Sequence, residues 1–225
     1  MKVLLFGATG MVGQGVLREC LLDPGVSSVV AVGRAPTGQR NEKLREIVRA
    51  DLADLSPVEA ELTGFDACFF CLGVSAAGMK EEAYRRVTFD LTLAVARILA
   101  RRNPGMTFVY VSGMGTDSSE RGRVMWARVK GATENALLAL PFRAAYMFRP
   151  AIIRPLHGVR SKTKLYDVFY TALGPALSLV APLLPKHVTT TERVGRAMLA
   201  VARNGASKRI LETEDINELG RESAA

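Results

Sequence analysis

The stretch Lys2-Val3-Leu4-Leu5-Phe6-Gly7-Ala8-Thr9-Gly10-Met11-Val12-Gly13 decides the fold of this 225-residue chain. Its apolar run 2–6 predicts a buried strand, and the amphipathic run 11–22 predicts a helix directly after a Gly-x-x-Gly-x-x-Gly loop. A turn of this kind points backbone N–H groups and the positive end of the helix dipole at a diphosphate, without any charged side chain. Three glycines in a first loop can also make only a turn, but this context favours dinucleotide binding.

Each glycine of the loop is expected to have its own task. Gly7 lets the chain leave the strand sharply, Gly10 lets the backbone approach a phosphate, and Gly13 lets the helix pack closely on the sheet. The predicted cofactor-binding residues of this turn are Gly7, Thr9, Gly10, Met11, Val12 and Gly13.

The rest of the first 155 residues repeats this order of strand and helix. Further strands are predicted at 27–33, 46–50, 66–72, 107–112 and 143–149, and further helices at 54–63, 80–101 and 123–140. Such alternation is typical of a parallel sheet with helices on both faces. The predicted fold class is therefore α/β, a doubly wound parallel sheet of the Rossmann type, with residues 1–155 as its NAD(P)-binding core.

Residues 156–225 differ in texture, with helical stretches at 163–184 and 191–202, a late strand at 209–211 and a short final helix. We expect a small C-terminal helical region that packs on the same domain and covers the substrate. The apolar stretch 165–184 is interrupted by a charge, a glycine and prolines, so no transmembrane span is expected. A lid over the pocket is favoured, and a dimer interface or a contact with a membrane surface are the alternatives.

Composition bounds the classes of partner. The net charge of +8 suits phosphates, nucleic acid, anionic lipid or acidic substrates. The arginines are scattered without an aromatic-interleaved basic strip, so no nucleic-acid partner is expected.

The first residues lack a basic leader with an apolar core, which predicts a cytoplasmic location. Cys20, Cys68 and Cys71 make an odd count that fits reduced thiols, and the apolar strand around the last two favours core cysteines over a redox pair.

The end of the second predicted strand indicates which dinucleotide is bound. An acidic residue there would select NAD through the adenosine ribose hydroxyl, but this chain has Val32-Gly33-Arg34. An arginine fork can grip a 2′-phosphate, so NADP is the predicted cofactor and NAD is the alternative. Arg40 and Lys43 could help in the following loop, or could be simple solvated charges.

Two further strand ends are expected to face the cofactor. Asp51 and Leu52 follow the third strand, where the carboxylate of Asp51 either meets the adenine edge or caps the next helix. Cys71, Leu72 and Gly73 end the fourth strand and are predicted to lie along the cofactor, because glycine permits a close approach.

With the later motifs, these residues resemble the short-chain dehydrogenase/reductases, specifically atypical, extended-like members related to the Tat-interacting-protein and NmrA-like branches. The resemblance covers essentially the whole chain. The segments that carry it are the glycine loop, Val109-Tyr110-Val111-Ser112, Lys130 and Arg149-Pro150-Ala151-Ile152-Ile153-Arg154-Pro155.

The resemblance implies a reaction centre made of a strand serine, a Tyr-x-x-x-Lys helix and the nicotinamide. In that centre the tyrosine passes a proton while the cofactor passes hydride. Ser112 and Lys130 match, but Trp126 holds the tyrosine position. The resemblance also implies that Lys130 bonds the nicotinamide ribose and that Arg149, Pro150 and Ile152 lie beside the carboxamide.

Trp126 changes the chemistry, because an indole N–H is only a donor and cannot titrate as an acid or base. Three explanations stay open. The proton could come from Ser112, from water or from another tyrosine, with Tyr84, Tyr110 and Tyr166 as candidates. Trp126 could instead stack on the substrate or nicotinamide, or the protein could bind NADP without turnover.

The predicted function is an NADP-dependent oxidoreductase acting on a carbonyl or alcohol. The alternative is a catalytically weak or inactive NADP-sensing module that regulates a partner. Arg154 and Arg160 could meet an acidic or phosphorylated small-molecule substrate, or could be plain basic surface. A homodimer through helices is a further expectation. His157 and His187, the only histidines, lack the spacing of metal ligands, so no metal is expected.

Overall fold

The computed structural model describes residues 1–159, 184 and 186–222. Its strands are β1 (Lys2–Phe6), β2 (Ser28–Gly33), β3 (Leu44–Val48), β4 (Ala67–Phe70), β5 (Thr107–Val111), β6 (Ala144–Arg149), β7 (Ile152–Arg154), β8 (Val188–Thr190) and β9 (Ile210–Glu212). Its helices are α1 (Met11–Leu22), η1 (Ser56–Leu62), α2 (Glu81–Arg85), η2 (Arg86–Asp90), α3 (Leu91–Arg102), α4 (Met125–Leu138), α6 (Thr191–Asn204) and α7 (Thr213–Glu222). The stretch 165–184, predicted as a lid, lies outside the described residues except for its last residue.

Seven strands form one parallel sheet in the order β3-β2-β1-β4-β5-β6-β9. The order reverses between β1 and β4, where the carboxyl ends of the strands open a crevice in folds of this kind. The predicted doubly wound Rossmann fold is therefore confirmed. Its switch point lies directly beside the glycine loop that follows β1.

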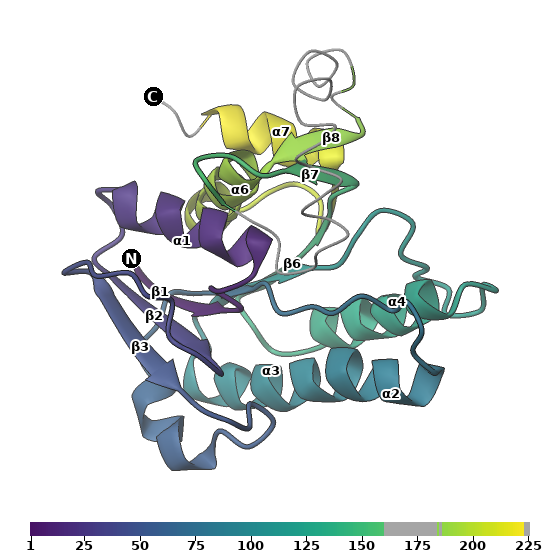
Figure 1. Cartoon of the computed structure of the whole chain (residues 1–225), viewed down its shortest axis with the longest axis horizontal. Coiled ribbons are helices and arrows are strands. Elements are labelled where there is room, and N and C mark those ends of the chain that lie inside the picture. The colour runs from purple at the N-terminus through teal and green to yellow at the C-terminus, as the bar shows by residue number, and fades with distance from the viewer. Residues whose placement is uncertain (160–183, 185, 223–225) are drawn as a thin grey trace.

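Helices cover both faces of the sheet, as Figure 1 shows: α1, α6 and α7 lie on one face and α2, α3 and α4 on the other. The strands bury side chains toward each face, so the sheet separates two apolar clusters. Leu5 and Phe148 belong to the cluster under α1 and α6, whereas Phe70 and Phe108 belong to the cluster over α3. Burial on both faces explains why these strands are continuously apolar rather than alternating.

The boundaries differ from the predictions in three places. Strand β3 ends at Val48 because its partner β2 ends at Gly33 in the paired register. The run 54–63 is a 3₁₀-helix with a proline near its start and one buried residue, so it has little apolar face to hold a longer α-helix. The predicted long helix 80–101 contains a π-helical segment, η2, between α2 and α3.

The last described segment joins the same sheet. Strand β9 pairs with β6 at the edge, and α6 packs against both α1 and α7. A second, two-stranded parallel sheet of β7 and β8 was missed, because runs of three residues carry no periodicity. Within the described residues, no helix is long and apolar enough to cross a bilayer.

Replacing Gly13 with alanine should destabilise the protein strongly. A Cβ at this position would lie 2.1 Å from the carbonyl oxygen of Gly7, so the helix or the loop must shift. We expect a loss of about 3 kcal/mol, the upper end of typical overpacking costs. At this chain length that lowers the thermal midpoint by roughly 6–12 °C, which calorimetry would measure. Gly73→Ala is the control, since nothing lies within 4 Å of its added Cβ; equal midpoints for the two variants would contradict the close packing of α1.

Candidate functional site

The glycine loop is held in a conformation that larger residues do not fit. Gly7 has a φ of +83°, and a Cβ there would lie 2.7 Å from the carbonyl carbon of Cys71 on the neighbouring strand end. The Gly10 N–H closes the turn by donating to the Gly7 carbonyl at 2.9 Å. The loop is therefore packed closely against the chain that follows β4.

The N-terminus of α1 suits an anion. No side chain caps this helix at Gly10, and its first turn holds no acidic residue. The first N–H groups of a helix have no partner within the helix, and the positive end of the helix dipole adds to their attraction for phosphate. Met11 and Val12, the first residues of α1, line a cavity. The residues present thus fit the diphosphate of a dinucleotide.

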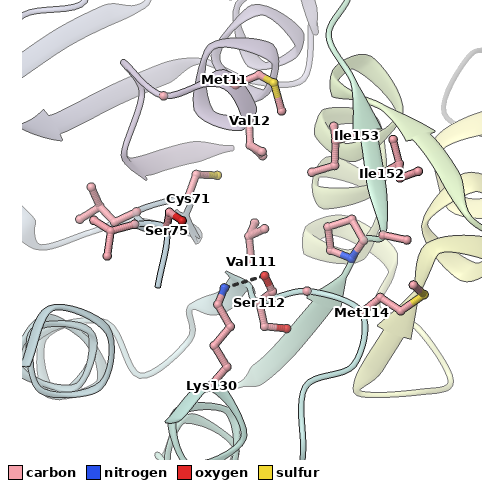
Figure 2. Close-up of a pocket in the computed structure, with 17 residues that line it drawn as sticks. Met11, Val12, Cys71, Ser75, Val111, Ser112, Met114, Lys130, Ile152 and Ile153 are labelled. Atoms are coloured by element: carbon pink, nitrogen blue, oxygen red, sulfur yellow. Dashed lines mark hydrogen bonds between the residues drawn. The ribbon is translucent and has the colours of Figure 1, made fainter. Parts of the chain in front are cut away.

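A cavity of about 560 Å³, here called the central cavity, lies where β1, β4 and β5 end and β7 begins. Figure 2 shows Met11 and Val12 on one side of it, Lys130 rising from α4 on the other, and Ile152 and Ile153 at its flank. Its lining residues are Gly10, Met11, Val12, Cys71, Leu72, Gly73, Val74, Ser75, Val111, Ser112, Gly113, Met114, Lys130, Pro150, Ala151, Ile152 and Ile153. Ten of these were predicted as site residues from the sequence: Gly10, Met11, Val12, Cys71, Leu72, Gly73, Ser112, Lys130, Pro150 and Ile152.

A second cavity of about 260 Å³, the β2 pocket, lies beyond the loop at the ends of β2 and β3. Leu72 lines both cavities, so they adjoin across the end of β4. The predicted residues Gly7, Thr9, Arg34 and Leu52 line the β2 pocket. Together the two cavities follow the carboxyl edge of the sheet on both sides of the glycine loop.

Glu46 also lines the β2 pocket, and sequence reasoning missed it. Its carboxylate accepts the backbone N–H of Thr37 at 2.6 Å, which ties the loop after Arg34 to β3. The omission follows from the predicted start of this strand at residue 46, whereas β3 begins at Leu44. The alternation along a strand does not fix the face of a residue that is predicted to begin it. The register pairs Glu46 with Ala31.

Lys130 is the cation of the central cavity. Its Nζ donates to the backbone carbonyl of Ser112 at 2.6 Å (Figure 2). The same atom lies 5.9 Å from the centre of the Tyr110 ring. Burial lowers the pKa of Lys130 to about 8, and the carboxylate of Glu134, one turn further along α4, offsets part of that effect. The amine is therefore poised to exchange a proton near neutral pH.

The hydroxyl of Ser112 is engaged with the protein. Its Oγ lies within hydrogen-bond distance of the Glu134 carboxylate and of the Phe148 carbonyl, the latter at 3.1 Å, and it has one proton to donate. Ser112 is buried, and it reaches the central cavity while this hydroxyl faces Glu134. Met114, in the loop after β5, places an exposed side chain at the cavity.

Arg149 belongs to the same buried group. Its Nε donates to both oxygens of Glu134, at 3.0 and 3.1 Å, and its Nη2 also bonds Glu134 and Ser118. The carboxylate of Glu134 has no solvent exposure and raises the pKa of Arg149. The guanidinium that was predicted beside the carboxamide is thus directed at Glu134, and Arg149 is not among the residues that line the central cavity.

Three other predicted residues also stand apart from the cavities. Trp126 lies in the first turn of α4, where its ring faces Gly115 in the loop after β5. Asp51 is exposed, and its carboxylate accepts the N–H of Ala53 in a local turn rather than capping η1. Gly13 serves the packing of α1 on the loop. None of the three is among the described residues that line either cavity.

The fold and the loop define a nucleotide-binding α/β protein whose cleft follows the carboxyl edge of its sheet. Residues 7–141 match the model of a family described as NAD(P)H-binding, and the chain belongs to that family. It is also 27% identical over 227 residues to the mitochondrial protein fmp52-2 of Aspergillus oryzae, a match that covers 97% of this chain and 96% of the relative.

Solved structures share the fold at low sequence identity. MoeE5, solved in complex with UDP-glucose and NAD, has a TM-score of 0.69 and 20% identity, covering 100% of this chain and 82% of that one. A short chain dehydrogenase family protein from Francisella tularensis subsp. tularensis SCHU S4 has a TM-score of 0.64 and 16% identity, covering 91% of both chains. The resemblance to short-chain dehydrogenase/reductases is confirmed at the level of the fold.

The predicted cytoplasmic location is wrong by the comparison with sequence relatives. The Aspergillus oryzae relative is named a mitochondrial protein, and further fungal relatives carry the same label. The prediction was drawn from the first residues alone, and the names of the relatives contradict it.

Removing the charge of Glu134 should cost more stability than removing a surface charge. Glu134→Gln leaves the guanidinium of Arg149, whose side chain is 11% exposed, with Glu212 at 3.6 Å as its remaining ion-pair partner among the described residues. We expect a loss of about 3–5 kcal/mol, as for other broken buried pairs, measured by urea unfolding. Glu82→Gln, which breaks a surface pair with Arg86, is the control and should change little. A small effect at Glu134 would show that the buried pair is not structural.

Proposed function

We propose that this protein is an oxidoreductase that uses a nicotinamide dinucleotide to interconvert a carbonyl and an alcohol. One observation carries the proposal: the central cavity joins the open N-terminus of α1 to the amine of Lys130. Its volume is within the range of small-molecule sites. The diphosphate would lie against Met11 and Val12, and Lys130 would meet the nicotinamide ribose. The bound dinucleotide would supply or accept hydride.

We further propose that the preferred cofactor is NADP. Arg34 lines the β2 pocket at the end of β2 and is exposed, so its guanidinium is available for a 2′-phosphate. Glu46 in the same pocket would repel a phosphate, but its carboxylate already accepts the Thr37 N–H. In this arrangement Glu46 positions the loop of Arg34. NAD remains the competing cofactor, since MoeE5 was solved with it.

The substrate that fits the central cavity best is an apolar carbonyl compound. The side chains that line this cavity are mostly aliphatic or thioether, and Val74 and Met114 are exposed at 46% and 47%. Such a lining offers few partners to an ionised carboxylate or phosphate, whose desolvation would go uncompensated. The acidic substrate considered from sequence depended on Arg154 and Arg160. Arg154 is not among the described lining residues, and Arg160 lies outside the described part of the chain.

A second candidate function is a binding module that senses NADP. The observation that favours it is the loss of both usual donors of this fold: the Ser112 hydroxyl faces Glu134, and Trp126 faces Gly115. Such a protein would bind the dinucleotide without transferring hydride. Direct detection of hydride transfer separates the two functions.

The deciding experiment follows deuteride from labelled NADPH into product. The purified protein is given straight-chain aldehydes of increasing length and matched aldehydes that end in a carboxylate. We expect deuterated alcohol from the longer alkyl aldehydes and a much lower kcat/KM for the carboxylated ones, because the lining is apolar. Binding of NADPH without deuterium in any product would instead support the binding module.

Arg34→Ala should weaken NADPH far more than NADH. Loss of one charge-assisted contact to phosphate is worth about 1.5–3 kcal/mol, or roughly 10- to 150-fold in Kd. Calorimetric titration of both cofactors would measure it. Arg40→Ala is a matched control, because Arg40 is an exposed arginine in the same loop and outside the residues that line the β2 pocket. Equal losses for NADPH and NADH would remove the basis for NADP.

A further inference from the structure

The central cavity needs a proton donor if it reduces a carbonyl, and the described residues offer few. Tyr110 is buried with its hydroxyl at Thr133, and burial raises its pKa. Tyr84 is buried, with a raised pKa, and Tyr146 accepts the N–H of Ala206. None of these three tyrosines is among the described residues that line the cavity, and Tyr166 lies outside the described part of the chain.

The other protic groups of the lining are poor acids. Burial raises the pKa of the Cys71 thiol far above its usual range. The hydroxyl proton of Ser112 lies on Glu134 or on the Phe148 carbonyl. Ser75 stands in an exposed loop, where its hydroxyl accepts the N–H of Ala77. A hydroxyl that has given up its proton regains one only slowly when no neighbouring acid or base relays it.

Lys130 differs from all of these in geometry. Its ammonium has three N–H bonds, and the bond to the Ser112 carbonyl uses one of them. The side chain lines the cavity from α4, opposite the N-terminus of α1 (Figure 2). No salt bridge to Lys130 is found among the described residues, so its proton is not held by a carboxylate.

The charged and titratable groups around Lys130 come from several elements. Glu134 lies on the same helix, but its carboxylate is occupied by Arg149 from β6 and by Ser112. Tyr110 from β5 presents its ring face to the ammonium. Cys71, at the end of β4, stays a neutral thiol. Glu134 is therefore the carboxylate whose field acts on the amine, and it favours the charged form.

We infer that the ε-ammonium of Lys130 gives its proton to the substrate oxygen during reduction, in the role that a tyrosine hydroxyl would fill at position 126. The inference rests on the proposed function. A bound reduced dinucleotide would supply the hydride for the new C–H bond at the carbonyl carbon. An N–H bond of Lys130 breaks, an O–H bond forms on the substrate, and the neutral amine takes a proton from solvent. In the oxidation direction the neutral amine accepts the proton from the alcohol.

The acidity of the amine suits this role. With a pKa of about 8, Lys130 is mostly protonated at neutral pH and is a stronger acid than an ordinary lysine. Reduction needs the protonated form, so its kcat/KM should fall as pH rises through about 8. Oxidation needs the neutral form, so its rate should rise over the same interval.

The test combines kinetics with a direct titration of the amine. Reductive methylation with ¹³C-formaldehyde labels the lysines, and the Lys130 resonance is identified by its absence in Lys130→Arg. We expect this resonance to titrate near pH 8 in the protein without cofactor. Lys130→Arg keeps a cation for the ribose, so NADPH affinity should stay within about threefold. Its reduction rate should fall about 10²- to 10⁴-fold, because a guanidinium does not release its proton.

Three controls separate the possible outcomes. Lys208→Arg changes an exposed lysine paired with Asp215 and should leave the rates unchanged. Cys71→Ser should keep the pH dependence if the lysine, and not the thiol, is the donor. Trp126→Tyr should leave the Lys130 titration in place.

Turnover in Lys130→Arg close to that of the wild type, or titration of Lys130 above pH 10, would overturn the inference while leaving the proposed function intact. Absence of hydride transfer in the wild type would overturn both. Loss of NADPH binding in Lys130→Arg would assign the lysine to binding alone and would also overturn its role as donor.

Discussion

The buried ion pair of Glu134 and Arg149 is the interaction on which the Lys130 side of the central cavity depends. A carboxylate without solvent exposure is stable only when its oxygens are occupied, and here Arg149 and Ser112 occupy them. The pair joins α4 to the ends of β5 and β6. It thereby fixes the helix that carries Lys130 one turn earlier, and the charge of Glu134 offsets part of the effect by which burial lowers the pKa of Lys130.

The nucleotide side depends on a steric constraint instead. The glycine loop leaves β1 at the point where the strand order reverses, and it fits only because Gly7 and Gly13 bring backbone against backbone. This close packing leaves the N-terminus of α1 open toward the central cavity, while the β2 pocket lies on the other side of the loop. In the proposed complex the helix end would meet the diphosphate, and Arg34 would meet the far end of the cofactor.

Trp126 stands where the resemblance implies a tyrosine, so the proposed reaction requires another acid. The indole of Trp126 turns toward Gly115, and the serine that usually assists is bound to Glu134. What remains at the cavity is a partly buried amine among aliphatic side chains. Desolvation lowers the pKa of a lysine toward neutral pH. A hydrogen bond from a lysine has the same effect on the pKa of a tyrosine hydroxyl. The apolar lining, which favours an apolar substrate in our proposal, is the same environment that lowers the pKa of Lys130.

By itself the sequence determined the sheet, its parallel order, the glycine loop and most residues of the central cavity, because buried strands and glycine spacing are local patterns. The resemblance to short-chain dehydrogenase/reductases also placed Lys130 at the reaction centre, and Lys130 lines the central cavity. The tertiary structure decided what local patterns do not contain. The pairing register assigned Glu46 to the β2 pocket, burial directed Arg149 to Glu134, and packing set the ring of Trp126 against Gly115. A side chain follows the partner that compensates its charge or fills its space, and for these residues that partner lies far away in the sequence.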